Sequence, residues 1–162
     1  RLGLMDGMEE YQFSPNTALT RAQAAQILYN LEGQPTPTQG GCFPDVIGHW
    51  AASAIAWAAQ NGVVSGYNNG TFCPEQGVTR QELAQMMYNY SSYKGRDLSA
   101  RGDLSLYPDR GKIQGWALDA MGWAVGEGLF TGHGNGTIDP ESTATRAQAA
   151  SLLTKFHQTL GR

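Results

Sequence analysis

The sequence predicts an all-α domain in which three similar helical repeats pack around a pseudo-threefold axis. A Thr-Arg pair followed by Gln or Glu recurs three times, starting at Thr20, Thr79 and Thr145. Each copy opens an amphipathic run with helical spacing, and such helices cannot bury their apolar faces alone. A Gly-rich loop precedes each of the last two copies, and these two repeats align at an offset of 66 residues.

The second helix of each repeat begins at the recurring Thr. The Thr and the Gln or Glu three positions later form a capping box, in which each side chain accepts a hydrogen bond from the other residue's amide. Apolar spacing predicts these helices over 21–31, 80–90 and 146–160. The Arg after each Thr lies in the first turn, where the helix dipole makes a cation mildly unfavourable. Three such arginines in register indicate a cation that binds an anionic ligand.

The first helix of each complete repeat carries two tryptophans seven positions apart. The pattern predicts helices over 49–61 and 114–127. The pairs are Trp50 with Trp57 and Trp116 with Trp123. We expect at least two of the four in the core, because large aromatic side chains on one helix face are usually buried. The two nearest the helix starts, Trp50 and Trp116, are the better candidates to touch a ligand.

The loop between the two helices is rich in glycine. Gly66 and Gly132 allow a ligand to approach the backbone closely, and Tyr67 and His133 follow them in positions that can line a pocket. An Asn-Gly pair comes next in both copies, which predicts a tight turn or a very short hairpin.

Composition limits the class of protein. The 162 residues are 41% hydrophobic and 15% charged, which fits one globular domain. The net charge of −3, with scattered basic residues, argues against nucleic-acid binding, and no apolar stretch is long enough to insert into a membrane. No nucleophile-and-base order or phosphate loop appears, and the histidines lack ligand spacing. The sequence therefore predicts no enzyme, no cofactor and no metal site.

The first repeat is shorter than the other two, because its first helix would lie before Arg1. We expect the chain to be part of a longer polypeptide. We also expect either upstream sequence or a second copy of the chain, by self-association, to cover the apolar face of this repeat. Cys42 and Cys73 are either two thiols or a disulfide that ties the start of repeat two to its loop, and the sequence leaves both open.

The ordered set of motifs resembles the S-layer homology family. Repeat two carries the family's elements in order: Phe43-Pro44-Asp45, Trp50-Ala51, a Gly-rich loop ending in Phe72-Cys73-Pro74, and Thr79-Arg80-Gln81-Glu82. Gln replaces Glu in the first and third caps, which keeps the capping chemistry. The resemblance implies one domain over 1–162, with a partial repeat at 1–33, a second repeat at 42–93 and a third at 106–160.

The resemblance also implies a function. The chain is similar to extracellular, non-catalytic modules that anchor a larger bacterial surface protein to a cell-wall polysaccharide ending in a pyruvylated amino sugar. Grooves between neighbouring repeats would bind this glycan, with each Arg and the free amides of its helix start pairing with the ketal carboxylate. The candidate ligand-binding residues are Arg21, Arg80, Arg146, Asp45, Asp109, Trp50, Trp116, Gly66, Gly132, Tyr67 and His133.

Two alternatives stay open at this point. The two aspartates either cap the following helix or form an Asx turn, or they accept hydrogen bonds from sugar hydroxyls, as the resemblance implies. The second alternative is that the repeats as a whole serve protein–protein contact, in surface-layer assembly or host-protein binding, with the arginines in salt bridges.

Overall fold

The computed structural model describes residues 17–37, 43–67, 69–130 and 136–160, and these form an all-helical domain, as the sequence predicts. The α-helices are α2 (Arg21–Leu31), α3 (Ala52–Gln60), α4 (Arg80–Tyr93), α5 (Leu118–Gly126) and α6 (Arg146–Leu160). Short 3-10 turns are η2 (Pro44–Val46), η3 (Leu104–Leu106), η4 (Arg110–Lys112) and η5 (Gly115–Ala117). None of the described helices is both long and apolar enough to span a membrane.

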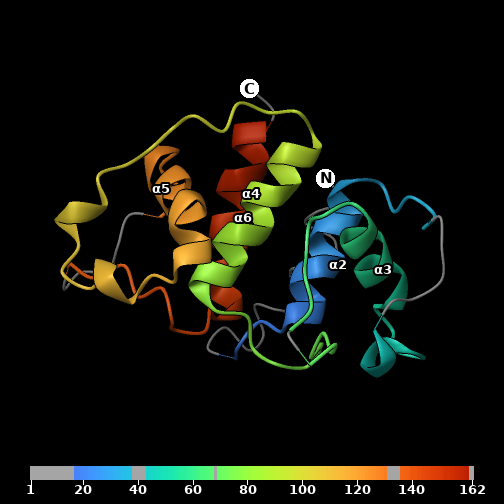
Figure 1. Ribbon diagram of the computed structural model, residues 1–162. Helices are drawn as coiled ribbons and strands as arrows, with labels where there is room; N and C mark the ends of the chain where they lie inside the picture. Colours follow the sequence, from blue (N-terminus) through green and yellow to red (C-terminus); the bar gives the residue numbers. More distant parts are fainter. Residues whose placement is uncertain (1–16, 38–42, 68, 131–135, 161–162) are drawn as a thin grey trace.

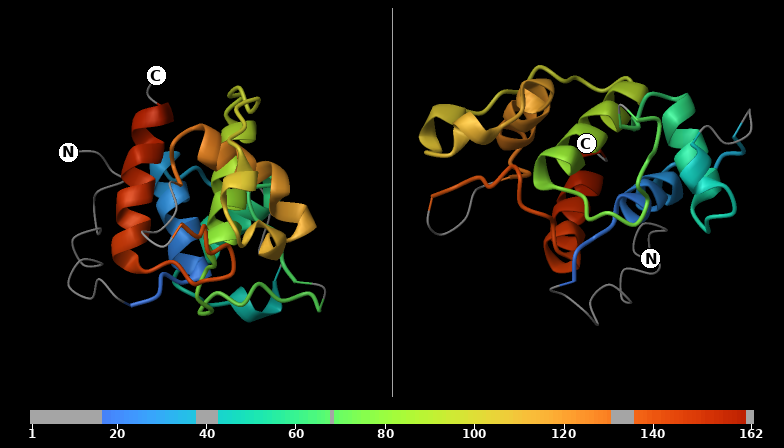
Figure 2. Two further views of the ribbon diagram at one scale, coloured as in Figure 1. Left: turned by 90° about the vertical axis from the view of Figure 1, so that its left-hand side faces the viewer. Right: turned by 60° about the horizontal axis from the view of Figure 1, so that its bottom comes forward.

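The three second helices start from a common ring of backbone hydrogen bonds. The amide of Leu19 donates to Ala144 O at 2.9 Å, that of Ala144 to Val78 O at 2.9 Å, and that of Val78 to Leu19 O at 2.8 Å. The ring closes on itself, so the predicted pseudo-threefold axis is confirmed for the described residues. Figure 1 shows α2, α4 and α6 with α3 and α5 on opposite outer sides, and the right-hand view of Figure 2 looks onto the end that carries the ring.

Capping fixes the start of the second helices. Both halves of the capping box are present at Thr20 with Gln23 and at Thr79 with Glu82, and Thr145 makes the same exchange with Gln148. The helices therefore begin where the sequence predicts. Helix α4 continues three residues beyond the prediction, to Tyr93, and Gly95 then takes a φ of +72°.

The first helices start later than predicted. Helix α3 begins at Ala52 instead of His49, and α5 begins at Leu118, preceded by the 3-10 turn η5. No side chain caps either helix start. In repeat two the Nδ1 atom of His49 accepts from the amide of Ala51 at 3.0 Å, which holds a turn there in place of the first helical residues.

A line of aromatic contacts crosses the core and joins the five α-helices of the described residues. The ring centroids of successive pairs lie 5.6–6.2 Å apart. The line runs through Tyr29, Trp57, Tyr90, Phe156, Trp123 and Tyr88. Trp57 and Trp123 are each 2% exposed, which confirms the expectation that at least two of the four tryptophans are buried.

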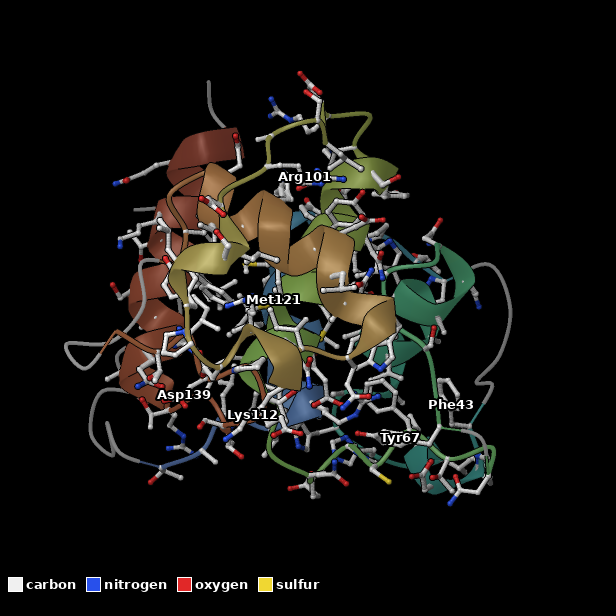
Figure 3. All side chains as sticks on the ribbon, turned by 60° about the vertical axis from the view of Figure 1, so that its left-hand side comes forward. Phe43, Tyr67, Arg101, Lys112, Met121 and Asp139 are labelled. Carbon is white, nitrogen blue, oxygen red and sulfur yellow. The ribbon has the colours of Figure 1, made fainter. Side chains whose placement is uncertain are left out.

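The segment after α4 packs against α5. The amide of Gly102 donates to Gly122 O at 2.8 Å. A Cβ atom at Gly126 would lie 2.7 Å from the nitrogen of Arg101, so only glycine permits this approach. Figure 3 shows Arg101 on one side of the molecule, with Tyr67, Phe43, Lys112 and Asp139 toward the other side, where the Gly-rich loops lie.

Candidate functional site

A groove of about 540 Å³ lies where the three repeats meet, and we call it the Arg21 groove. It is bounded by Arg21 at the start of α2, by the loop 63–67 of repeat two, by one face of α4, and by Trp116 of repeat three. The loop and α4 contribute Val63, Val64, Ser65, Gly66, Tyr67, Glu82, Gln85, Met86 and Asn89. Four predicted site residues, Arg21, Gly66, Tyr67 and Trp116, therefore share one groove between repeats.

Arg21 is held firmly in the wall of this groove. The residue is only 6% exposed. Its Nε donates to Phe72 O at 2.8 Å and its Nη2 to Ser65 O at 3.0 Å. The guanidinium carbon lies 4.4 Å from the ring centroid of Phe72 and 4.6 Å from that of Tyr67. The Arg thus extends from repeat one into the loop of repeat two and fixes that loop against the helix start.

Glu82 provides the counter-charge. Its Oε2 accepts from Arg21 Nη1 at 3.2 Å and from the Tyr67 hydroxyl at 2.9 Å. Its Oε1 accepts from the amide of Thr79 at 2.9 Å, as the capping box requires. Burial, together with this hydrogen bond to Glu82, raises the pKa of Tyr67, while Arg21 opposes the rise. One carboxylate therefore caps α4, neutralises Arg21 and orients Tyr67.

Two amides from successive turns of α4 add polar groups to the groove. The Nε2 of Gln85 donates to Asn89 Oδ1 at 2.8 Å, and Asn89 Nδ2 donates to Val63 O at 3.1 Å. Among the described residues the Gln85 Oε1 atom is buried without a hydrogen-bond partner. The sequence pattern indicated neither amide, and it gave Glu82 only the role of a capping residue. The recurring spacing of Gln26 with Asn30 and Gln85 with Asn89 could have identified the pair.

Trp116 and Trp50 are both exposed, at 54% and 61%. Trp116 belongs to η5 and lines the Arg21 groove together with residues of α4. Trp50 lies beside His49, with ring centroids 5.3 Å apart, and does not border this groove. The structure thus brings one of the two candidate tryptophans to the groove.

The two predicted aspartates bind the backbone amides of the Gly-rich loops. Asp45 accepts from the amides of Phe72 and Cys73 at 3.0 and 2.8 Å, and Asp109 accepts from Ile138 and Asp139 at 3.0 and 2.8 Å. Asp45 lies within η2 and Asp109 is the N-cap residue of η4, and neither turn has a side-chain cap. Cys73 and Asp139 occupy equivalent positions with φ of +57° and +50°, so each carboxylate stabilises a left-handed turn.

The pKa values of both aspartates reflect these bonds. The amide of Phe72 is the largest influence on Asp45 and lowers its pKa, with a smaller contribution from Cys73. For Asp109 burial is the largest single influence and raises the pKa, but the amides of Ile138, Asp139 and Asp109 together with the charge of Lys112 outweigh it, so the pKa is lowered. Each carboxylate is therefore ionised in the folded protein under neutral conditions and binds the loop as an anion.

The other two arginines occupy equivalent positions around the axis. Arg80 is 9% exposed, donates from Nε to Ile138 O at 2.9 Å, and lies 4.7 Å from the ring centroid of Phe130. Burial lowers its pKa, although Asp139 and Asp109 act in the opposite direction. Arg146 is half-buried, and its backbone amide donates to Thr17 O at 2.8 Å. Gly132, His133 and Cys42 lie outside the described residues. Cys73 is a free thiol in the structure, which agrees with the two-thiol alternative for the cysteines.

The expectation that helix-start amides are free for an anion is wrong. The amide of Arg21 donates to Gln76 O at 2.8 Å and that of Ala22 to Pro74 O at 2.9 Å. The amides of Arg80 and Gln81 donate in the same way to carbonyls of repeat three. The loop of the next repeat therefore occupies the site that an isolated helix would offer to an anion. In the part of the chain that the structure describes, no group of three metal-binding side chains comes together.

Comparison with known proteins identifies relatives over nearly the whole chain. The S-layer homology domain family matches residues 1–25, 43–84 and 106–150. An endoglucanase of a Bacillus species is 30% identical over 93% of the chain and 16% of its own length. A cellulosome-anchoring protein of Acetivibrio thermocellus is 30% identical over 88% of the chain and 33% of its length. The S-layer protein sap of Bacillus anthracis is 27% identical over 98% of the chain and 19% of its length. The chain thus spans a third or less of each of these relatives.

Proposed function

The chain belongs to the S-layer homology domain family, and from this premise we propose that it is a cell-wall glycan-binding module that anchors a larger surface protein. The predicted location at the bacterial cell surface agrees with relatives that are an S-layer protein and a cellulosome-anchoring protein. In the endoglucanase relative the matching part is 16% of the protein, so the shared segment is a module and not the whole enzyme. The proposed domain covers 1–162, with repeats at 1–33, 42–93 and 106–160.

The observation that carries the proposal is that the exposed Trp116 lines a groove of about 540 Å³ together with polar side chains. That volume lies within the usual range of small-ligand sites. An indole ring offers an apolar surface to the C–H face of a sugar, while amides and hydroxyls can bind the sugar's polar edge. Side chains from three repeats form this groove, so the glycan would bind only to the assembled domain.

We propose a secondary cell-wall polysaccharide with a pyruvylated amino sugar as the ligand. The ketal carboxylate would bind near Arg80 or Arg146. Arg21 pairs with Glu82 of the next repeat, and the residue of α6 equivalent to Glu82 is Gln148, which is uncharged. The equivalent position therefore gives Arg80 no carboxylate. Guanidinium groups suit carboxylate recognition because their donors match both oxygens.

Binding to purified cell walls tests the proposal. The chain should sediment with walls that retain their secondary polysaccharide and not with walls from which it has been extracted. Trp116→Ala should weaken binding about tenfold or more, as expected when a central aromatic contact is lost. Leu118→Ala is the matched control, because Leu118 lies on the same segment, is 47% exposed and does not line the groove. Equal binding to both wall preparations would contradict the proposal and favour a protein partner.

A further inference from the structure

We infer that His49 is a pH-sensitive switch at the start of α3. Uptake of a proton by its imidazole opens the turn over residues 49–51 and moves the exposed Trp50, which lies beside the ring. Neither residue lines the Arg21 groove, and the inference does not depend on which ligand the domain binds. It adds a conformational response to pH in a part of repeat two outside that groove.

The hydrogen bonds of His49 require a neutral imidazole. Its Nδ1 accepts from the amide of Ala51 at 3.0 Å, so Nδ1 carries no proton. The proton of the neutral ring is then on Nε2, which faces the Oε2 atom of Glu75. A protonated imidazole has a donor at both nitrogens and no acceptor, so it cannot keep the bond to Ala51. The closed turn therefore selects one protonation state of His49.

The amide of Ala51 cannot exchange this acceptor for water while the turn is closed. Ala51 is 0% exposed and is the residue directly before α3. A proton on Nδ1 would place two donors against each other, and the amide would be left buried without an acceptor, which is costly. Opening of the turn relieves both problems, because water can then accept from the amide.

The charges around the ring do not offset this cost. Among the described residues Glu75, from the loop that follows Pro74, is the titratable group in contact with His49, and its carboxylate favours the cation. The Glu75 side chain is 72% exposed, so solvent screens the pair and the pair contributes little. From α3 the ring faces the positive end of the helix dipole, with no acidic residue in the first turn. Loss of the Ala51 bond therefore outweighs the attraction to Glu75.

Repeat three contains the corresponding turn without a titratable acceptor. At the offset of 66 residues, Ala117 is equivalent to Ala51 and is also 0% exposed. Its amide donates to the backbone carbonyl of Gln114 at 2.9 Å, and Gly115 occupies the position of His49. A backbone carbonyl takes up no proton at these pH values. The start of α5 should therefore not respond to pH, although the start of α3 does.

Trp50 is placed by the same turn. The ring centroids of His49 and Trp50 lie 5.3 Å apart, with the planes inclined at 33°. Because 61% of Trp50 is exposed, its position depends strongly on the backbone of the turn and on this ring contact. Opening of the turn changes both, so the indole moves relative to the ring.

Amide hydrogen exchange, measured by NMR at about pH 7.5 and about pH 5, tests the inference. An imidazole takes up its proton within this range, whereas a glutamate stays largely ionised. Each rate is divided by that of an unstructured amide at the same pH. Protection of the Ala51 amide should fall about fivefold or more at the lower pH, because the turn opens locally. Protection of the Ala117 amide is the internal control and should change by less than about twofold. Nuclear Overhauser contacts between the His49 and Trp50 rings should weaken over the same range.

Two variants assign the effect to the imidazole. In His49→Asn the side-chain oxygen can accept from the amide two residues on, as in an Asx turn, and it does not titrate. Protection of Ala51 in this variant should be the same at both pH values. Glu75→Gln removes the carboxylate that favours the cation, so Ala51 should keep about twofold more protection at the lower pH than in the original chain.

Four results would overturn the inference or part of it. Ala51 protection in the original chain that does not change with pH would overturn it. So would an equal fall in His49→Asn, or less protection in Glu75→Gln than in the original chain at the lower pH. Overhauser contacts that persist while Ala51 loses protection would refute the movement of Trp50. Thermal melts at both pH values show whether each chain is folded, and Glu75→Gln decides by itself if His49→Asn is not.

Discussion

Replacement of Arg21 separates its structural role from a ligand-binding role. Arg21→Ala removes three hydrogen bonds, to Phe72 O, Ser65 O and Glu82, the last of which is also an ion pair, at a residue that is 6% exposed. It also removes the guanidinium from between the rings of Tyr67 and Phe72. The two carbonyl oxygens and the carboxylate would then lack the partner that they have in the native fold.

The magnitude follows from the burial of these groups. Breaking a buried ion pair by removing one partner costs about 3–5 kcal/mol, and a hydrogen bond from a charged donor contributes about 1.5–3 kcal/mol. The contributions are not additive, because the groups form one network. We therefore expect a loss of about 3–5 kcal/mol in the free energy of unfolding. This loss is large for a domain whose total stability is about 5–15 kcal/mol.

Urea unfolding followed by tryptophan fluorescence measures this change. The midpoint should fall at an unchanged m-value, and the melting temperature should fall by about 6–20 °C for a domain of this size. Arg110→Ala is the matched control, because Arg110 is exposed and its two contacts to carbonyls are 3.5 Å long. A loss below about 1 kcal/mol for Arg21→Ala would refute the reasoning, because it would mean that the network contributes little to the fold and that Arg21 is available to a ligand.

Two further predictions concern the hydrogen bonds from Asp109 to its loop and the close contact of the segment at Arg101 with α5. Asp109→Asn should cost about 1–2 kcal/mol at neutral pH, because an amide can accept only one of the two loop bonds. The folded pKa of Asp109 is lowered from 3.8, so its contribution is present above that pH and is lost below it. The unfolding free energies of the original chain and of Asp109→Asn should therefore converge at acidic pH. A constant difference from pH 7 to pH 3 would show that the ionised Asp109 carboxylate does not stabilise the loop. Gly126→Ala should destabilise by about 1–3 kcal/mol, because its Cβ would lie 2.7–2.9 Å from backbone atoms of Arg101 and Gly102. Gly111→Ala, with open space around its Cβ, is the control; a gain of about 1 kcal/mol at Gly126, from helix propensity alone, would refute the crowding.

Local chemistry determined the helices that the sequence could predict. A capping box is a short-range exchange between residues three positions apart, so the starts of α2, α4 and α6 followed from the sequence alone. The burial of Trp57 and Trp123 followed from their helical spacing. The starts of α3 and α5 did not, because neither has a side-chain cap and a local turn competes with the helix.

Repetition in the sequence also determined the pseudo-threefold arrangement and the family. It placed Arg21, Gly66, Tyr67 and Trp116 among the candidate ligand residues before any geometry was known. It could not decide which of them share a groove, because they come from three repeats and are up to 95 residues apart in the chain. Only the packing of the three repeats around the closed ring of backbone hydrogen bonds brings these residues together.

The roles of the charged groups were decided by the tertiary structure. A pattern that places Arg at a helix start does not reveal that the next repeat's loop carbonyls occupy both the guanidinium and the neighbouring amides. Nor does it reveal that Glu82 neutralises Arg21, because that contact joins residues 61 positions apart. Hydrogen-bonding groups are used by whichever partner packs closest. The sequence by itself therefore determined the repeats, their helix starts and the family, whereas packing decided which side chains remain available to bind a ligand.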